Sequence, residues 1–367
     1  MPLVLLLLQL CVILLSARLC GLLLRALGQP MVIGEMAAGI LLGPIVFGAL
    51  SPQLHAQLFP PASLAALSSL STLGVVLFMF IVGAEMRSPG QGGMGAQLKA
   101  SLWVGLASMA LPIALGVAIA PLLYPQLAPA GVAFWPFAMF LAVALSITAF
   151  PVLARILKDR AMTRTRVGQL ELGSAAVVDA CAWMVLALVL ALGSAGGGLA
   201  DFLRISCGLV AFVAAVFLVL KPAYAWLLRR QGAGAEPSEM VLAALLIGLF
   251  ACAMGAEWLH LHAIFGAFLF GICLPRDDRL LHALEARITP LAVIVLLPVF
   301  FALAGLGTSA EAFAGAGLGA MALVLAAAML GKIAGGAAGA RMAGYDWRDS
   351  LATGSLMNAR GLMELIV

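Results

Sequence analysis

Apolar runs of roughly 20 residues recur along almost the whole of this chain, and they constrain its fold more than any other feature. In the hydrocarbon core of a bilayer, backbone groups find hydrogen-bond partners only within helices or closed barrels. The 64% share of hydrophobic residues and the 10% share of charged residues exclude an ordinary soluble domain. We therefore predict an all-α polytopic membrane protein. Its expected helices lie at about 3–24, 31–50, 63–86, 98–123, 132–157, 167–192, 203–228, 239–256, 259–275, 288–307, 316–341 and 350–367.

Basic residues between these segments alternate along the chain. The loops that follow odd-numbered segments carry nearly all of the loop Lys and Arg residues, whereas the loops after even-numbered segments carry only Arg204. Lys and Arg accumulate on the cytoplasmic side of membrane proteins. The alternation therefore predicts a multi-pass protein whose N-terminus lies outside.

The segment at 132–157 contains a helix breaker. Pro151 lacks the amide hydrogen that a helix needs, and its ring clashes with the carbonyl group of Ile147. A helix that breaks at membrane depth leaves backbone groups without partners, which is tolerated only beside protein or a water-filled cavity. The hydroxyls of Ser146 and Thr148 are placed to cover those groups or to offer oxygens to a cation. A simple packing kink at Pro151 is the alternative interpretation.

Charged side chains at membrane depth indicate where such a protein works. Asp179 lies near the middle of segment 167–192, and an ionisable side chain there is costly enough to suggest a functional site. Lys332, near the middle of segment 316–341, is the natural charge partner of Asp179. Arg360 can hold the partial negative charge of exposed helix carbonyls. A buried ion-pair network that only fixes helix packing is the alternative.

A weak internal repeat is visible in the sequence. The stretch Val32–Pro44 resembles Ile264–Pro275, and continuing the register pairs Thr148–Pro151 with Asn358–Gly361. The two repeats start at segments 1 and 8, so they have opposite orientations, and paired broken helices in inverted repeats are typical of secondary transporters. Helix-packing faces would also explain the glycine patterns. The repeat predicts three parts: a first repeat at 1–195, a linker helix at 200–232, and a second repeat at 238–367, truncated within its broken helix.

These features predict competition between a cation and a proton at one carboxylate, which is antiport by alternating access. Asp179, Thr148 and Ser146 are the expected ligands of the cation or proton. Lys332 and Arg360 are the expected charge partners, and the helix breaks are marked by Pro151, Asn358 and Gly361. We expect a transporter rather than an enzyme, with no cofactor, no resident metal and no nucleic-acid partner. A gated potassium efflux pathway and a membrane sensor or scaffold without transport are the alternatives.

The chain resembles the cation:proton antiporter-2 family of bacterial sodium/proton and potassium/proton exchangers. The matching stretches are Gln29–Pro44, Leu77–Glu85, Ser146–Arg155, Ser174–Trp183, His262–Pro275, Leu297–Gly305, Gly331–Lys332 and Leu356–Val367. The resemblance implies a sodium/proton antiporter fold with two crossed broken helices, about 12 of an expected 13 helices being present. It also implies Na⁺ or K⁺ and protons as substrates, a homodimer, and a location in the bacterial inner membrane.

The same resemblance assigns Asp179 as the essential carboxylate, with Lys332 and Arg360 as its basic partners. The family commonly carries Asp or Asn before this residue, whereas this chain carries Val178. In the family an Asp-Asp pair accompanies electrogenic exchange and an Asn-Asp pair accompanies electroneutral exchange. A single carboxylate here therefore favours one cation for one proton.

Other polar residues carry less specific signals. His260 and His262 lie together on the expected outer side, where an interfacial pair is favoured over a zinc or pH-sensing role. Asp277 and Asp278 fall in a basic loop and are expected to be solvated.

Overall fold

The computed structural model describes residues 2–86, 93–129, 131–193, 198–230, 237–275, 277–308 and 317–360. Within these ranges the regular secondary structure is entirely helical, and nine spans are long and apolar enough to cross a membrane. The predicted all-α membrane fold is confirmed. The first half comprises α1 (Pro2–Ala26), α2 (Met31–Leu42), α3 (Pro52–Leu58), α4 (Pro61–Glu85), α5 (Gly93–Leu127), α6 (Phe134–Ser146), α7 (Phe150–Asp159) and α8 (Arg166–Gly193). The second half comprises α9 (Gly198–Ala215), α10 (Lys221–Arg230), α11 (Glu239–Trp258), α12 (Ala263–Cys273), α13 (Asp278–Leu291), α14 (Leu297–Leu306), α16 (Leu318–Met342) and α17 (Trp347–Met357).

Three short π-helical turns lie inside longer helical segments. They are η1 (Pro44–Gly48) after α2, η2 (Val216–Leu220) between α9 and α10, and η3 (Ala292–Leu296) between α13 and α14. The last of these extends the helix predicted at 288–307 back to Asp278. Asp277 and Asp278 are exposed, as the sequence predicts, although α13 already begins at Asp278 and the Asp277 carboxylate caps it by accepting from the Arg279 amide at 2.9 Å.

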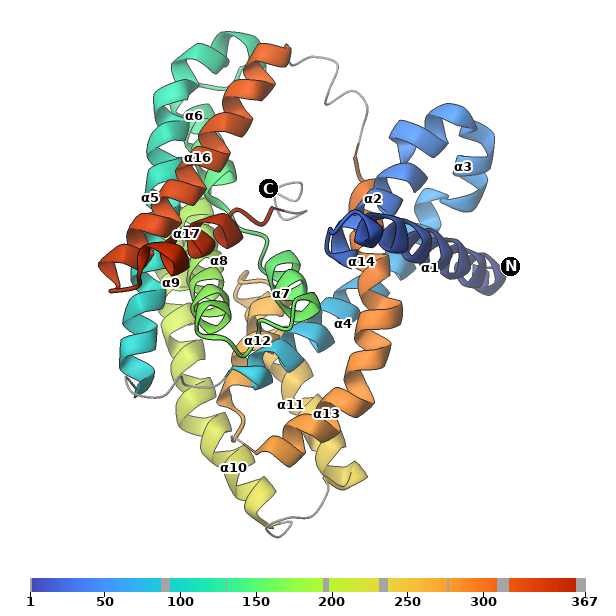
Figure 1. Cartoon of the computed structure of the whole chain (residues 1–367), viewed down its shortest axis with the longest axis vertical. Helices are drawn as coiled ribbons and strands as arrows, with labels where there is room; N and C mark the ends of the chain where they lie inside the picture. Colours follow the sequence, from blue (N-terminus) through green and yellow to red (C-terminus); the bar gives the residue numbers. More distant parts are fainter. Residues whose placement is uncertain are drawn as a thin grey trace.

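The helices pack as two bundles. In Figure 1, α5, α6, α16 and α17 lie at the left, whereas α1, α2 and α14 lie at the right. The first, here called the core bundle, contains α5, α6, α8, α16 and α17. The second, here called the panel, contains α1, α2, α4, α11, α12, α13 and α14. Helix α7 contacts α8 of the core bundle and also α2 and α4 of the panel, so it lies at the junction.

Glycines allow the closest helix contacts inside the panel. A Cβ atom on Gly305 of α14 would strike the backbone of Gly39 in α2, and one on Gly271 of α12 would strike the backbone of α4 next to Gly83. Small residues of this kind let membrane helices approach closely. The predicted repeat pairs Gly39 with Gly271, and the segments that follow each stretch, Leu77–Gly83 and Val299–Gly305, share an aromatic and glycine pattern that pairs Gly83 with Gly305. The contact of Gly305 with Gly39 and the contact of Gly83 with Gly271 are therefore equivalent under the repeat. This relation supports the inverted repeat, whose boundaries stay a prediction.

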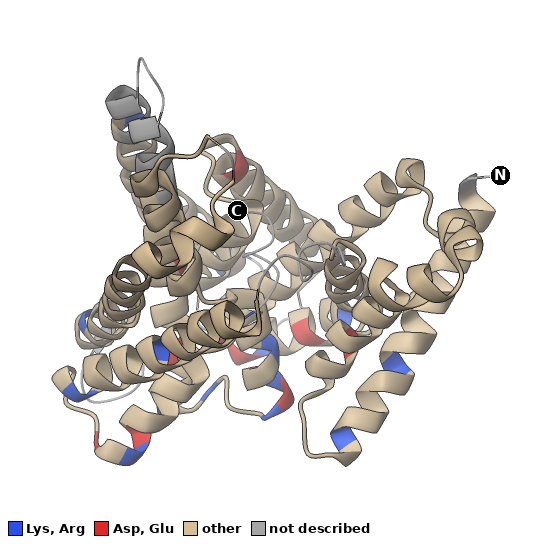
Figure 2. Ribbon diagram, turned by 90° about the horizontal axis from the view of Figure 1, so that it is seen from above, with Lys and Arg blue, Asp and Glu red and all other residues tan. Residues whose placement is uncertain are grey.

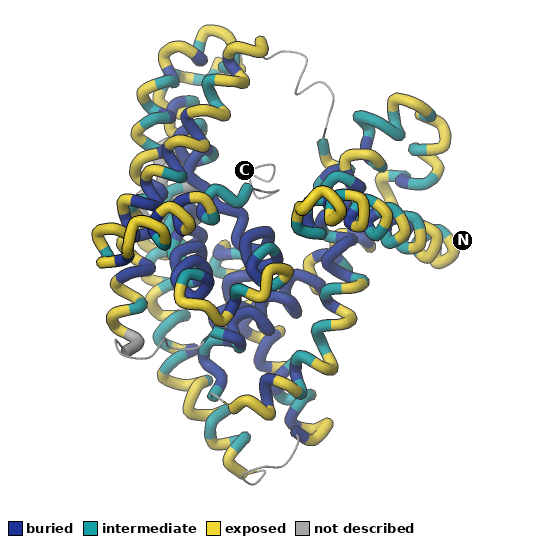
Figure 3. Tube along the Cα trace, in the orientation of Figure 1, coloured by how far each residue is buried: buried dark blue, intermediate teal, exposed yellow. Residues whose placement is uncertain are grey.

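Burial and charge are distributed as a membrane fold requires. The most buried part of the chain lies where α4, α7 and α12 meet, while α1 and the outer faces of α9 and α10 are largely exposed (Figure 3). Exposed large apolar side chains, such as Leu23, Val210 and Leu218, are suited to contact lipid. Charged residues gather toward one side of the molecule, the lower side in Figure 2.

Candidate ion-binding site at two crossed helix breaks

The first break separates α6 from α7. Helix α6 ends at Ser146, Ile147 has an extended backbone with φ −69° and ψ 145°, and α7 begins at Phe150. Pro151 occupies the first turn of α7, where its missing amide hydrogen costs no helical bond. The break predicted at 146–151 is therefore present, with Ser146 donating to the Val143 carbonyl oxygen at 2.8 Å.

The second break follows α17, which ends at Met357 with Asn358 as its C-cap. Gly361, the remaining predicted break residue, lies outside the described residues. The amide of Ala149 donates to the carbonyl oxygen of Ala359 at 2.9 Å, and the Thr148 hydroxyl donates to the carbonyl oxygen of Met357 at 3.1 Å. The two broken segments are therefore crossed, as the sequence predicts.

Arg360 connects both breaks to a third helix. Its guanidinium donates to the carbonyl oxygen of Leu145 at 3.2 Å and to that of Ala328 at 3.0 Å. Leu145 lies in the last turn of α6, where unpaired carbonyls carry partial negative charge. Arg360 therefore bonds to helix carbonyls, as the sequence predicts. The Leu145 carbonyl, however, belongs to the first broken helix and not to α17, the helix that Arg360 follows.

Lys332 brings a full positive charge to the same place. It is completely buried in α16, and its ammonium group donates to the Thr148 hydroxyl at 2.5 Å. Thr148 is also completely buried. A continuous chain of hydrogen bonds therefore runs from Lys332 through Thr148 to the backbone of Met357 at the second break.

Asp179 faces this positive charge from α8. The residue is only 4% exposed, and Lys332 is the charged group whose field acts on its carboxylate. Val178, directly before it, is completely buried. The structure thus brings Asp179, Thr148 and Lys332 into one region, with Arg360 at its edge. Ser146 also lies at the break, but its hydroxyl is directed back into α6.

Sequence reasoning missed a second carboxylate in this region. Glu171 is completely buried in α8, and Lys332 acts on it as it does on Asp179. The expected end of the helix at residue 167 placed Glu171 close to the membrane surface. Its spacing of two helical turns from Asp179 was the available signal, because residues at i, i+4 and i+8 share one helix face.

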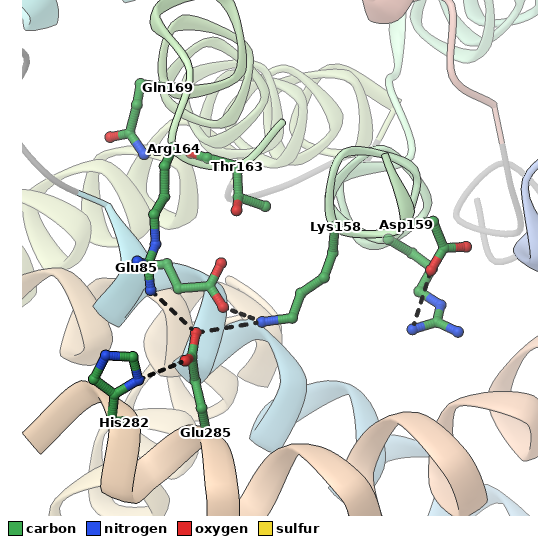
Figure 4. A network of polar contacts seen from close by, with 9 residues as sticks. Glu85, Lys158, Asp159, Thr163, Arg164, Gln169, His282 and Glu285 are labelled. Atoms are coloured by element: carbon green, nitrogen blue, oxygen red, sulfur yellow. Dashed lines mark hydrogen bonds and ion pairs between the residues drawn. The ribbon is translucent and has the colours of Figure 1, made fainter. Parts of the chain in front are cut away.

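A separate network of ion pairs joins the panel to α7 and the loop after it. The carboxylate of Glu85 accepts from Lys158, and Glu285 lies 3.8 Å from Lys158 and 3.4 Å from Arg164. Figure 4 shows the Lys158 side chain reaching toward both carboxylates. In each of these pairs the basic residue comes from α7 or the following loop and the acidic residue comes from the panel.

Arg155 makes a further bond of this kind, to Glu35 of α2 at 3.5 Å. Both residues are nearly or completely buried. Arg155 is therefore paired inside the protein, because a buried charge without a partner is strongly disfavoured.

His262 is the N-cap residue of α12. Its Nδ1 atom accepts from the Ile264 amide at 3.4 Å, and its φ of 64° lies in the left-handed region. Burial lowers the pKa of His262, against a smaller opposing effect of the Glu257 carboxylate. Among the described residues no group of three or more His, Cys, Asp or Glu is arranged to hold a metal.

Two helices that break at membrane depth, bond to each other and enclose a buried aspartate near a buried lysine define the fold of a secondary transporter. The fold of the sodium/proton antiporter MjNhaP1 from Methanocaldococcus jannaschii is similar, with a TM-score of 0.62 and 15% sequence identity. The match covers 100% of this chain and 86% of that structure.

Sequence comparison identifies the family. Residues 13–367 match the family described as sodium/hydrogen exchanger, transmembrane, and the chain belongs to that family. The suspected relationship to cation:proton antiporters is confirmed.

Named relatives come from several kingdoms. The chain is 37% identical to cation/H⁺ antiporter 17 of Arabidopsis thaliana, over 99% of its own length and 44% of the relative. It is 33% identical to K⁺/H⁺ antiporter 1 of Saccharomyces cerevisiae, over 100% of its length and 42% of the relative. It is 36% identical to the Na⁺/H⁺ antiporter NhaS4 of Synechocystis, over 92% of its length and 82% of the relative. The chain thus spans less than half the length of the first two relatives.

Proposed function

We propose that this protein exchanges a monovalent cation, Na⁺ or K⁺, for protons at a site formed by Asp179 and the crossed helix breaks. The observation that carries the proposal is the bond from the buried Lys332 ammonium to Thr148 at the first break, because the same ammonium also acts on the Asp179 carboxylate. The names of the relatives, K⁺/H⁺ and Na⁺/H⁺ antiporters, support the same substrates.

The mechanism follows from competition for one carboxylate. Ionised Asp179 offers hard oxygen ligands to a small cation, and Thr148 and the carbonyls freed at the breaks can complete its coordination. Protonation of the site removes the negative charge that holds the cation. If the site crosses the membrane only when it is occupied by a proton or a cation, the two must exchange.

The two-bundle architecture suits alternating access to such a site. The predicted cation ligands lie in α6, in α8 and in the break before α7. The panel contacts this region through α7, which packs against α2 and α4, and through α8, which packs against α12. A change in the relative position of the bundles would therefore open the site to one side or the other. Within this proposal the protein is a transporter and not an enzyme, it forms a homodimer in the bacterial inner membrane, and its N-terminus lies outside.

The experiment that tests the proposal uses the full-length protein in proteoliposomes that contain a pH-sensitive dye. A pH gradient is imposed, and Na⁺, K⁺ or Li⁺ is added in turn. We expect the native protein to collapse the gradient with at least one ion and Asp179→Asn to abolish the collapse while remaining folded. Asp349→Asn, which removes a half-buried carboxylate in the first turn of α17, is the control and should retain exchange. Full activity in Asp179→Asn would reject the carboxylate mechanism, and uncoupled K⁺ flux would favour a gated efflux pathway.

A further inference from the structure

A second carboxylate lies on the same face of α8 as Asp179. Glu171 precedes Asp179 by two helical turns, a rise of about 12 Å along the helix axis. It is also nearer to Arg166, where α8 begins and where the sequence places the cytoplasmic side. Glu171 therefore lies between Asp179 and the expected cytoplasmic end of the helix.

Glu171 has no hydrogen-bond partner of normal geometry. Both of its carboxylate oxygens are buried and unbonded among the described residues, although the Thr353 hydroxyl faces the carboxylate from α17. That hydroxyl is itself buried and unbonded. A buried carboxylate without partners is strongly disfavoured, so Glu171 requires either a proton or a compensating positive charge.

The nearby charges do not balance when both carboxylates are ionised. From α16, Lys332 is the positive charge that acts on both Glu171 and Asp179. Arg360, at the edge of the site, donates to the carbonyls of Leu145 and Ala328. Among the described residues, one ammonium group that acts on two carboxylates leaves one net negative charge. The site is neutral only when it also holds one proton or one monovalent cation.

We propose that Glu171 carries the exchanged proton while Asp179 holds the cation, so that one cation replaces one proton. This inference rests on the proposed exchange function but moves the proton from Asp179 to Glu171, so that the cation and the proton compete through the charge that the two carboxylates share. When a cation binds at Asp179, the O–H bond of the Glu171 carboxyl breaks, the electron pair stays on the carboxylate, and the proton leaves. Lys332 then neutralises Glu171 and the cation neutralises Asp179. The reverse step restores the proton, so one positive charge enters for each one that leaves.

The test measures how many protons the full-length protein releases for each cation that it binds. Apparent dissociation constants for Na⁺, K⁺ and Li⁺ are obtained from cation-dependent thermal stabilisation between about pH 6 and about pH 9. In the pH range where Glu171 is protonated before the cation binds, the apparent cation affinity of the native protein should rise about tenfold for each unit by which the pH increases. In Glu171→Gln the affinity should lose its pH dependence, and it should fall by about tenfold or more because the bound cation leaves an unbalanced positive charge.

Three variants complete the test. Glu171→Asp should recover the pH dependence with a shifted midpoint, because it restores a carboxylate. Glu35→Gln, which removes an equally buried glutamate outside the site, should keep the native pH dependence. Asp179→Asn should lose cation binding altogether.

The outcomes separate this inference from the proposed function. An unchanged pH dependence in Glu171→Gln would overturn the inference, because Asp179 itself would then carry both the proton and the cation. Native protein that binds none of the three cations would overturn the exchange function and this inference with it.

Discussion

The backbone amide of Ala149 donates a hydrogen bond to the carbonyl oxygen of Ala359 at 2.9 Å, so the first broken helix is bonded directly to the second. Each break exposes backbone groups that lipid cannot satisfy. Here an amide of the first break donates to a carbonyl of the second break. Arg360 and Thr148 add side-chain hydrogen bonds to further carbonyls at the two breaks. The broken helices are therefore stable as a crossed pair, and their freed polar groups remain beside Asp179.

Thr148 is the residue at this crossing whose side chain is most suitable for a test. Thr148→Val keeps the shape of the side chain but removes the hydroxyl that accepts from Lys332 and donates to Met357. Leaving these buried groups without a partner should destabilise the protein by about 1–3 kcal/mol and weaken cation binding. Thr148→Ser, which retains the hydroxyl, should behave much more like the native protein. Equal melting temperatures for native protein and Thr148→Val would contradict the hydrogen-bond chain.

Lys332→Met should expose the electrostatic role of the buried lysine. Without its ammonium group, Asp179 and Glu171 are both buried without a positive charge, which should cost about 3–5 kcal/mol when they are ionised. The loss should shrink as the pH falls, because protons then neutralise the carboxylates. Thermal unfolding of native protein and Lys332→Met across a pH series measures this difference. A loss that does not depend on pH would show that Lys332 contributes packing alone.

Most of the fold could be predicted from the sequence, because bilayer thickness fixes helix length and Pro151 fixes a break. The repeat, which pairs Thr148–Pro151 with Asn358–Gly361, predicted two breaks of opposite orientation, and the family resemblance implied that they cross. Helix α5 was harder to delimit, since it contains Pro112, Pro121 and Pro125 yet continues to Leu127. Proline usually signals an end, but membrane helices tolerate it when neighbouring groups satisfy the freed carbonyls.

The site was predicted less completely than the fold. Asp179 and Lys332 could be found because single charges in the middle of apolar segments are unusual. Glu171 was not singled out because segment ends are uncertain by several residues, and a charge near an end is normally expected at the interface. The burial of such a residue depends on partners from distant segments, as Arg155 shows by its bond to Glu35. Single-segment hydropathy contains no information about such partners.

His262 should make the stability of the α11–α12 turn depend on pH. Burial lowers the pKa of His262 below its usual value of 6.5. As the pH falls through this value, the unfolded chain binds a proton before the folded chain does, so the free energy of unfolding should decrease. His262→Asn should reduce this decrease, because Asn tolerates a positive φ and can still cap α12. Melting temperatures between about pH 5 and about pH 8 provide the comparison. An identical pH dependence in the variant would assign it to other groups.

The ion pair between Lys158 and Glu85 should link the two bundles energetically. The Glu85 side chain is only 2% exposed and that of Lys158 is 21% exposed, so water screens their attraction weakly. A double-mutant cycle with Lys158→Met and Glu85→Gln should give a coupling energy of about 1–3 kcal/mol in thermal or chemical unfolding. Since movement of the bundles must break this pair, Lys158→Met should also change the rate of cation-triggered proton flux.

A matched pair nearby provides the control. Arg164 and Glu285 are 3.4 Å apart and also join the loop after α7 to the panel, but the Arg164 side chain is 46% exposed. The same cycle with Arg164→Met and Glu285→Gln should therefore give a coupling energy of about 0.2–1 kcal/mol. Similar coupling energies for the two pairs would show that burial does not strengthen the ion pair between Lys158 and Glu85. A coupling energy below about 0.3 kcal/mol for Lys158 and Glu85 would lead to the same conclusion. A larger coupling for the buried pair would show that Lys158, like Arg155 with its bond to Glu35, holds the broken helix to the panel.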